Sequence, residues 1–304
     1  MINRPTLAPT REKITFYMSP ELALMELETG KIISASFEEI PPITIPSITF
    51  HNLQAQWGMD ILACSNNSKE CHYWSKDTNQ WTTFPALNSV HTGGSMSVVG
   101  GTPVVIAGRD ENNNVHGIVN IFNVTTQKWI RGPSLMPIRT AHTTVVLNET
   151  TLLVIGGYDN FHLDAVNIFN LDELSWSDLN SLPQPTYRML CGLVNITYLL
   201  CIGGEVPGQL VNEAYVLDLS ISNPEWERKP SFDLEDPALG GFIYQIRDDL
   251  YCMTIFTSSY KPSMTLRRMN LNHATLTWEN LEVFTNFVGN IVSPYVLNGF
   301  QIKP

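Results

Sequence analysis

The segment from Thr143 to Trp176 decides the fold. It reads Thr143-Thr-Val-Val-Leu147, then Asn148-Glu-Thr150, then Leu152-Leu-Val-Ile-Gly-Gly157, and after a loop Val166-Asn-Ile-Phe-Asn-Leu-Asp-Glu-Leu-Ser-Trp176. Two short apolar runs joined by a polar turn predict a β-hairpin. The second half predicts a third strand, a polar turn and a last strand that begins at the tryptophan. The segment therefore predicts a unit of four antiparallel strands.

The same unit recurs along the chain at a spacing of 47 to 52 residues, which is typical of propeller blades. The tryptophans expected to begin the last strand of a unit are Trp81, Trp129, Trp176, Trp226 and Trp278. A sixth, N-terminal copy runs from Leu24 to Ile32 and has Ile32 at the tryptophan position. We therefore predict an all-β, six-bladed β-propeller of four-stranded blades over residues 13–304, after an N-terminal extension over residues 1–12.

One strand of the N-terminal unit is missing from its expected place. That unit offers a strand at Ile14 to Met18 and two later ones, whereas a spare strand remains near Asn290 to Leu297. A propeller ring closes when the last segment completes the first blade, which also leaves no open sheet edge. We therefore expect the C-terminal strand to complete the first blade.

The fourth unit resembles the kelch repeat. The matching residues are Leu135-Met-Pro-Ile-Arg139, His142, the pair Gly156-Gly157, Phe169 and Trp176, and the fifth unit repeats part of the pattern with Gly203-Gly204, Tyr215 and Trp226. Other units depart from the glycine pair, with Ala107-Gly108 in the third and Ala63-Cys64 in the second. We expect glycine where the chain turns with positive φ or approaches a neighbour closely, and tryptophan between adjacent blades.

Charge and composition argue against several kinds of partner. A net charge of −11 disfavours nucleic acids and anionic membranes, which attract a surplus of Lys and Arg. No apolar run reaches the roughly 18 residues of a membrane span, and Met1 to Lys13 lacks the apolar core of a signal peptide. We expect a cytoplasmic protein, the alternative being a secreted one whose leader lies upstream of Met1.

The loops between the second and third strands of each unit are the expected carriers of recognition, because loops on a rigid scaffold carry function. They contribute the candidate partner-binding residues Arg109, Asn112, Tyr158, Asn160, His162 and Tyr260. His91, Arg139 and Arg188 stand just before the first strand of successive units, in positions that the sequence makes equivalent. They predict either a basic sector that binds an acidic or phosphorylated peptide, or side chains that hydrogen-bond neighbouring blade carbonyls. For His142 we favour a histidine packed between blades.

The five cysteines fit neither a zinc pattern nor a disulfide scaffold, so we expect no metal. Cys64 and Cys71 flank one loop, and Cys191 and Cys201 face each other about a turn. Either pair could be bridged in an oxidising compartment, whereas free thiols are expected in the cytosol.

The resemblance to kelch proteins implies a protein-interaction propeller that binds a partner peptide or loop, as adaptors do, without catalysis or a cofactor. Two alternatives remain: a secreted kelch propeller that binds glycans or matrix, and a propeller hydrolase or oxidase. An enzyme would require clustered carboxylates or a metal set at the mouth of the disc.

Overall fold

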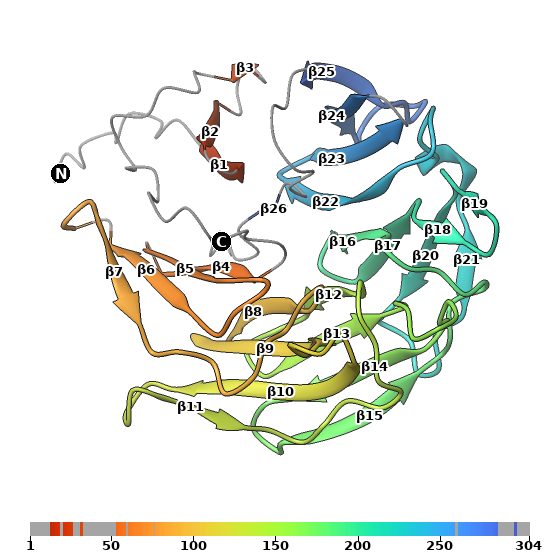
Figure 1. The fold of residues 1–304 in the computed structure, drawn as a ribbon. Helices are drawn as coiled ribbons and strands as arrows, with labels where there is room; N and C mark the ends of the chain where they lie inside the picture. The colour runs from red at the N-terminus through yellow and green to blue at the C-terminus, as the bar shows by residue number, and fades with distance from the viewer. Residues whose placement is uncertain are drawn as a thin grey trace, which may run out of the picture.

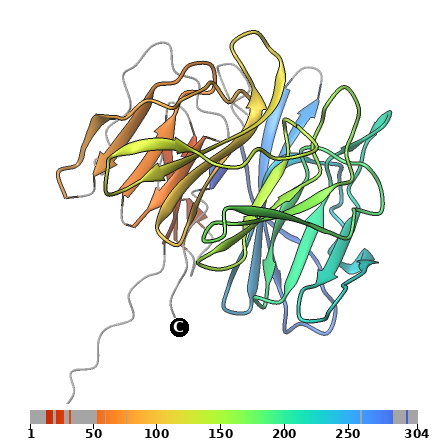
Figure 2. The ribbon, with the colours of Figure 1, turned by 90° about the horizontal axis from the view of Figure 1, so that it is seen from below.

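The fold is an all-β propeller of four-stranded antiparallel blades, seen here in a computed structural model. The structure describes residues 13–18, 21–26, 31–32, 53–58, 60–75, 77–258, 261–284 and 295–296, and the side chains of 53–58, 60–75, 77–245, 247–254 and 265–281. Figure 1 looks down on the disc, and Figure 2 shows the blades from the side, with their strands running between the two faces.

Five blades, named A to E, follow one another along the chain. Blade A contains β4 (Gln54–Trp57), β5 (Asp60–Cys64), β6 (Cys71–Ser75) and β7 (Gln80–Phe84). Blade B contains β8 (Ser95–Val99), β9 (Thr102–Arg109), β10 (Val115–Asn123) and β11 (Lys128–Arg131). Blade C contains β12 (Thr143–Val146), β13 (Thr151–Ile155), β14 (Val166–Asn170) and β15 (Ser175–Leu179).

The last two blades carry additions to this plan. Blade D contains β16 (Leu190–Val194), β17 (Tyr198–Ile202), β20 (Ala214–Asp218) and β21 (Trp226–Arg228), with the small hairpin β18 (Glu205–Val206) and β19 (Gln209–Leu210) in one loop. The 3-10 helix η1 (Pro230–Phe232) leads to blade E, which contains β22 (Leu239–Ile246), β23 (Asp249–Ser258), β24 (Lys261–Asn270) and β25 (Glu279–Phe284). The first strands β4, β8, β12, β16 and β22 surround the centre of the disc (Figure 1).

The structure thus shows five blades where the sequence predicts six. The N-terminal repeat contributes a four-stranded sheet in the order β26–β1–β2–β3, formed by β1 (Lys13–Met18), β2 (Glu21–Glu26), β3 (Lys31–Ile32) and β26 (Tyr295–Val296). This sheet contacts blade E through β26 with β22 and through β3 with β25. Ile32 stands where each other repeat has tryptophan, so this repeat lacks the indole donor described next.

Each of the blades B to E is joined to the segment that enters it by a tryptophan. The indole Nε1 of Trp129 donates to the carbonyl of Pro85 (2.8 Å) and that of Trp176 to the carbonyl of Pro133 (2.9 Å). The same bond joins Trp226 to Asn180 (2.9 Å) and Trp278 to Phe232 (3.0 Å). Four of these rings also pack in the apolar clusters between adjacent blades. These four tryptophans therefore hold blades B to E against the connections that precede them.

The glycine pairs lie where a side chain does not fit. Gly156 has φ +57° and a Cβ there would lie 2.2 Å from the Thr186 carbonyl oxygen; at Gly203, with φ +68°, it would lie 2.9 Å from that of Ala238. Gly157 and Gly204 also have positive φ. These positions therefore need glycine because φ is positive and because a neighbouring segment lies too close for a side chain.

In blade A the residues equivalent to the glycine pair are Ser65-Asn66, and the predicted assignment of Ala63-Cys64 to this place is wrong. The register shows it, because Cys64 pairs with Cys71 just as Ile155 pairs with Val166.

Candidate partner-binding face

The loops between second and third strands lie beside the connections between blades, and together they form what we call the loop face. Backbone bridges join Thr92 to Arg109, Thr140 to Tyr158 and Tyr187 to Glu205, each pairing a connection with a loop. The loop face therefore combines both kinds of segment, as the antiparallel strand order predicts.

A chain of backbone hydrogen bonds runs from blade to blade near the centre of this face. The amide of Ala141 donates to the Gly93 carbonyl (2.7 Å), that of Arg188 to Ala141 (3.0 Å), and that of Gly240 to Arg188 (2.6 Å). All four residues have positive φ, between 53° and 67°. Gly93, Ala141, Arg188 and Gly240 are therefore equivalent positions, which we call the inner ring.

The expected equivalence of Arg188 with His91 and Arg139 is wrong, whereas His91 and Arg139 do hold equivalent positions. A second series of bonds, from the amide of Gly108 to the Arg139 carbonyl (2.9 Å) and from that of Gly157 to Thr186 (3.0 Å), makes Thr186 the counterpart of Arg139. Arg188 lies two residues further along the chain. The sequence places them together because both are arginines before a first strand, whereas the backbone contacts between blades define the true register.

Arg139 is a structural residue and is not available to a partner. Its side chain is fully buried and donates to the carbonyls of Pro137 (3.0 Å), Gly156 (3.1 Å) and Ala165 (3.0 Å), and to Oδ1 of Asn167. Burial lowers the pKa of the guanidinium to about 10, so it stays charged at neutral pH. The prediction of a partner-binding Arg139 is corrected: the side chain joins the entry of blade C to its inner strands.

His91 occupies the same place in blade B and is likewise buried. Its Nδ1 lies 2.7 Å from the Ala107 carbonyl oxygen, and its Nε2 lies 2.6 Å from Nδ2 of Asn120. Burial lowers its pKa to about 3. His91 is therefore neutral, and it too must be removed from the set of partner-binding residues.

His142 is buried between blades B and C, as the sequence analysis favours. Its Nε2 lies 2.8 Å from the hydroxyl of Ser95, in the neighbouring blade. Desolvation, with smaller contributions from the charges of Arg139 and His91, lowers its pKa to about 3.

Arg188 is the arginine that reaches the surface of the loop face. Its side chain is exposed, and the guanidinium carbon lies 5.4 Å from the centre of the Tyr187 ring, a cation–π distance. The Tyr187 hydroxyl donates in turn to Oε2 of Glu205 (2.6 Å). Burial and this hydrogen bond raise the pKa of Tyr187 to about 12, so the hydroxyl remains a donor at neutral pH.

Two of the predicted loop residues join Tyr187 in an aromatic cluster. The ring centres of Tyr158 and Tyr187 are 5.5 Å apart, those of His162 and Tyr187 4.9 Å, and those of Tyr158 and His162 5.7 Å. Phe161, beside them, is 63% exposed. The sequence analysis missed Tyr187, Glu205 and Phe161, although the aromatic residues of the loop Tyr158–His162 indicate such a cluster.

Arg109 is the last residue of β9, and Asn112 lies in the loop between β9 and β10, whose shape is held by its own polar groups. The Asp110 carboxylate accepts from the amides of Asn112 (2.9 Å) and Asn114 (2.8 Å), and Arg109 Nη1 donates to the Asn113 carbonyl (3.0 Å). Asn112 is exposed. This loop presents one cation and several amides from blade B, next to the aromatic cluster of blade C.

The remaining candidates add little. Asn160 is exposed and donates to Asp159 (3.2 Å), whereas Tyr260 lies outside the described residues.

Within the described part of the chain, no group of three or more His, Cys, Asp or Glu side chains is arranged to hold a metal ion. Among the same residues no helix is long and apolar enough to cross a membrane.

Both cysteine pairs are bridged in the structure. Cys64 and Cys71 face each other across β5 and β6 with Cα atoms 3.9 Å apart, and Cys191 and Cys201 face each other across β16 and β17 at 4.2 Å. Cys252 is free and buried.

Comparisons with known proteins agree with this geometry. No protein-family model matches the chain. Kelch repeat protein M-T8 of myxoma virus (strain Lausanne) is 26% identical over 200 residues, which cover 63% of this chain and 38% of that protein. Kelch-like protein 21 of Homo sapiens is 31% identical over 64 residues, or 21% of this chain and 11% of that protein. The chain therefore matches well under half the length of these relatives.

A solved structure, titled "Structure of YjhT", shares the fold. It has a TM-score of 0.67 and 13% identity, and the match covers 90% of this chain and 98% of that chain. The chain is thus similar in sequence to kelch-repeat proteins and shares the β-propeller fold of this structure, and both findings support its resemblance to kelch-repeat propellers.

Proposed function

We propose that the chain is an adaptor-like interaction module that holds an extended segment of a partner protein on the loop face, without catalysis or a cofactor. The kelch relatives support an interaction module in general. The specific face is supported by the cluster of Tyr158, Tyr187 and Arg188, which combines an exposed cationic group with half-buried aromatic rings.

The placement of Arg188 carries the proposal. The inner ring has glycine at two of its four positions, and a residue with a Cβ at positive φ costs about 1–2 kcal/mol relative to the right-handed region. The backbone bonds of the ring need no side chain at all. Arg188 nevertheless places an exposed cationic side chain on the loop face, beside the ring of Tyr187, and this placement favours a role in recognition.

The chemistry of this surface favours a partner segment with a carboxylate or phosphate next to an apolar residue. Arg109 of blade B and Arg188 at the entry of blade D supply two cations on the loop face, and Phe161 and Tyr158 of blade C supply apolar surface. Because the chain carries a net charge of −11, an acidic segment would have to rely on short, hydrogen-bonded arginine contacts rather than on long-range attraction.

The test is affinity capture from native lysate with the wild-type chain and with Arg188→Gly as baits, quantified by mass spectrometry. We expect specific partners to be depleted at least tenfold on the variant. Glycine fits the backbone at φ 55°, so the variant should fold and the loss should report recognition alone.

Arg247→Gly provides the matched control. Arg247 is also an exposed arginine, with φ 53°, but it lies in the turn between β22 and β23 on the opposite face. The control should retain all partners. Equal recovery on all three baits would refute the proposed site.

The cysteine pairs favour one second candidate, a secreted propeller that binds glycans or matrix. Two cross-strand bridges are expected in an oxidising compartment, whereas the cytoplasm we otherwise propose would keep the thiols reduced. Glycans on the exposed sequon residues Asn148 and Asn195 in protein from its native source would support secretion. Unmodified asparagines and free thiols there would support the cytoplasm.

We also propose that the β26–β1–β2–β3 sheet is the sixth blade and closes the ring. Its pairing of Phe16 with Val296 and Tyr17 with Tyr295 supports this, since it joins the two ends of the chain. Deleting residues 289–304 should then abolish cooperative melting, because it exposes the edge of β1. A truncated chain that melts like the intact one would contradict closure.

A further inference from the structure

A shallow recess lies on the outer part of the loop face, between the connection that enters blade D and the strands β17 and β20. Its walls include Leu182, Pro183, Met189 and Val211, and one carboxylate, that of Glu213, stands among them. The recess therefore pairs an apolar lining with a single acidic group.

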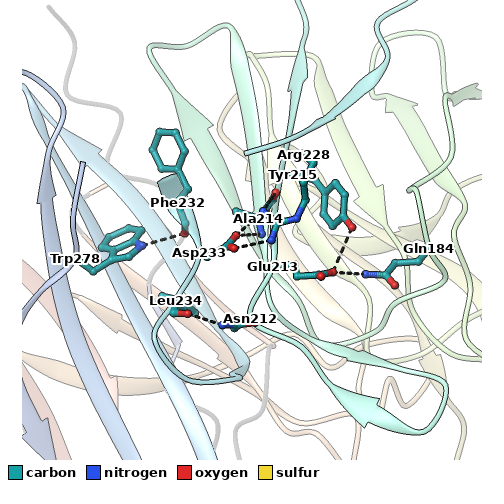
Figure 3. A network of polar contacts seen from close by, with 10 residues as sticks. All are labelled: Gln184, Asn212, Glu213, Ala214, Tyr215, Arg228, Phe232, Asp233, Leu234 and Trp278. Carbon is teal, nitrogen blue, oxygen red and sulfur yellow. Dashed lines mark hydrogen bonds and ion pairs between the residues drawn. The ribbon is translucent and has the colours of Figure 1, made fainter. Parts of the chain in front are cut away.

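Two side chains hold the Glu213 carboxylate in place. Nε2 of Gln184 donates to Oε2 (3.0 Å) and the Tyr215 hydroxyl donates to the same oxygen (3.3 Å) (Figure 3). Among the described residues, no hydrogen bond reaches Oε1. One oxygen is thus used for orientation while the other keeps its capacity to accept.

The nearest arginine does not form an ion pair with Glu213. Arg228 donates to both oxygens of Asp233, at 2.6 and 2.5 Å, and its guanidinium carbon lies 5.6 Å from the centre of the Tyr215 ring (Figure 3). Asp233 in turn accepts from the amide of Ala214 (2.9 Å). The Arg228–Asp233 pair therefore holds the end of η1 against blade D, and Arg228 is not an ion-pair partner of Glu213.

We propose that this recess binds a cationic side chain, arginine or lysine, of the partner. The aliphatic stem of such a side chain would pack on Pro183, which is exposed, and its charged head would donate to Glu213. The inference rests on the proposed function, because the cation would belong to the segment bound near Arg188. The bound segment would then place an acidic group near Arg188, toward the centre of the disc, and a basic group at the recess, toward the rim of the disc.

The probe is N-acetyl-L-arginine methylamide, titrated into the ¹⁵N-labelled full chain at low salt and followed by amide chemical shifts. Its control is the citrulline analogue, which has the same shape but no charge. We expect saturable millimolar shifts at Gly203 and Val211 with the arginine compound, at least tenfold weaker binding of citrulline, and weakening by added salt. Equal affinity for both compounds would overturn the proposal without any mutation.

Glu213→Gln keeps the acceptor for Gln184 and Tyr215 but removes the charge, and should abolish the shifts. Glu225→Gln, which neutralises an exposed carboxylate in the turn between β20 and β21, should leave them unchanged. Unchanged binding by Glu213→Gln would refute the site. Arg188→Gly should still bind the arginine compound, so loss of partners in that variant tests the proposed function separately.

Discussion

The amide of Arg188 donates a hydrogen bond to the carbonyl of Ala141, 3.0 Å away in the connection one blade earlier. Through this bond and its counterparts, the inner ring fixes the angle at which neighbouring blades meet near the centre of the disc. It also places the exposed side chain of Arg188 on the loop face, so the same backbone geometry holds the blades together and presents the candidate site.

The inner ring predicts opposite effects for two substitutions at Ala141, where φ is 53°. Ala141→Val should lower the free energy of unfolding by about 1–3 kcal/mol, because a β-branched side chain is strained at positive φ. Ala141→Gly should change it by less than about 1 kcal/mol, since glycine accepts this conformation. Urea denaturation of the two variants measures the difference, and equal midpoints would contradict the strain.

Arg139→Met should lower the free energy of unfolding by about 3 kcal/mol or more. The change leaves the buried acceptors of Gly156, Ala165 and Asn167 without their donor. Arg131→Met, at an exposed position on β11, is the control and should stay within about 0.5 kcal/mol of wild type. A mild effect of Arg139→Met, with loss of partner binding, would restore Arg139 as a recognition residue.

Stability should fall as the pH is lowered below about 6.5. His91 and His142 have an ordinary pKa of 6.5, and burial lowers the pKa of each to about 3 in the folded chain. Above pH 6.5 both histidines are neutral in the folded and in the unfolded chain, so neither of them lowers the free energy of unfolding. Below it the unfolded chain takes up protons that the folded chain refuses, so each histidine removes about 1.4 kcal/mol per pH unit until the pH nears its folded pKa.

Thermal melts between pH 7.5 and 5 measure this slope. His142→Asn should make the slope shallower, even though the variant is itself less stable at pH 7.5. An unchanged slope in the variant would show that His142 is not among the groups that resist protonation.

The cysteine pairs predict a specific thiol count. In protein purified under air, alkylation in denaturant without reductant should modify one of the five cysteines, Cys252, because the other four are bridged in two cross-strand pairs. Reduction before alkylation should expose all five. Five reactive thiols without reduction would show that neither bridge forms, and the same count on protein from its native source reports its compartment.

Most of the strands, the blade period and the roles of the repeated tryptophans and glycines could be predicted from the sequence. A tryptophan that begins a short strand and a glycine pair that ends another are local signals, and they recur often enough to reveal the repeat. Trp176 and Gly156 therefore have the predicted roles. The N-terminal repeat, where Ile32 replaces tryptophan, carries the weakest signal, and there the predicted count of blades departs from what the structure shows.

Only the tertiary structure decided which polar side chains reach the loop face. Arg139 and Arg188 look alike in the sequence, but one is buried beneath four acceptors and the other projects from a residue with positive φ. Tyr187 and Glu213 meet their partners, Glu205 and Gln184, across segments 18 and 29 residues apart. The register between blades depends on backbone contacts that neither composition nor local periodicity encodes, and those contacts separate the buried arginine from the exposed one.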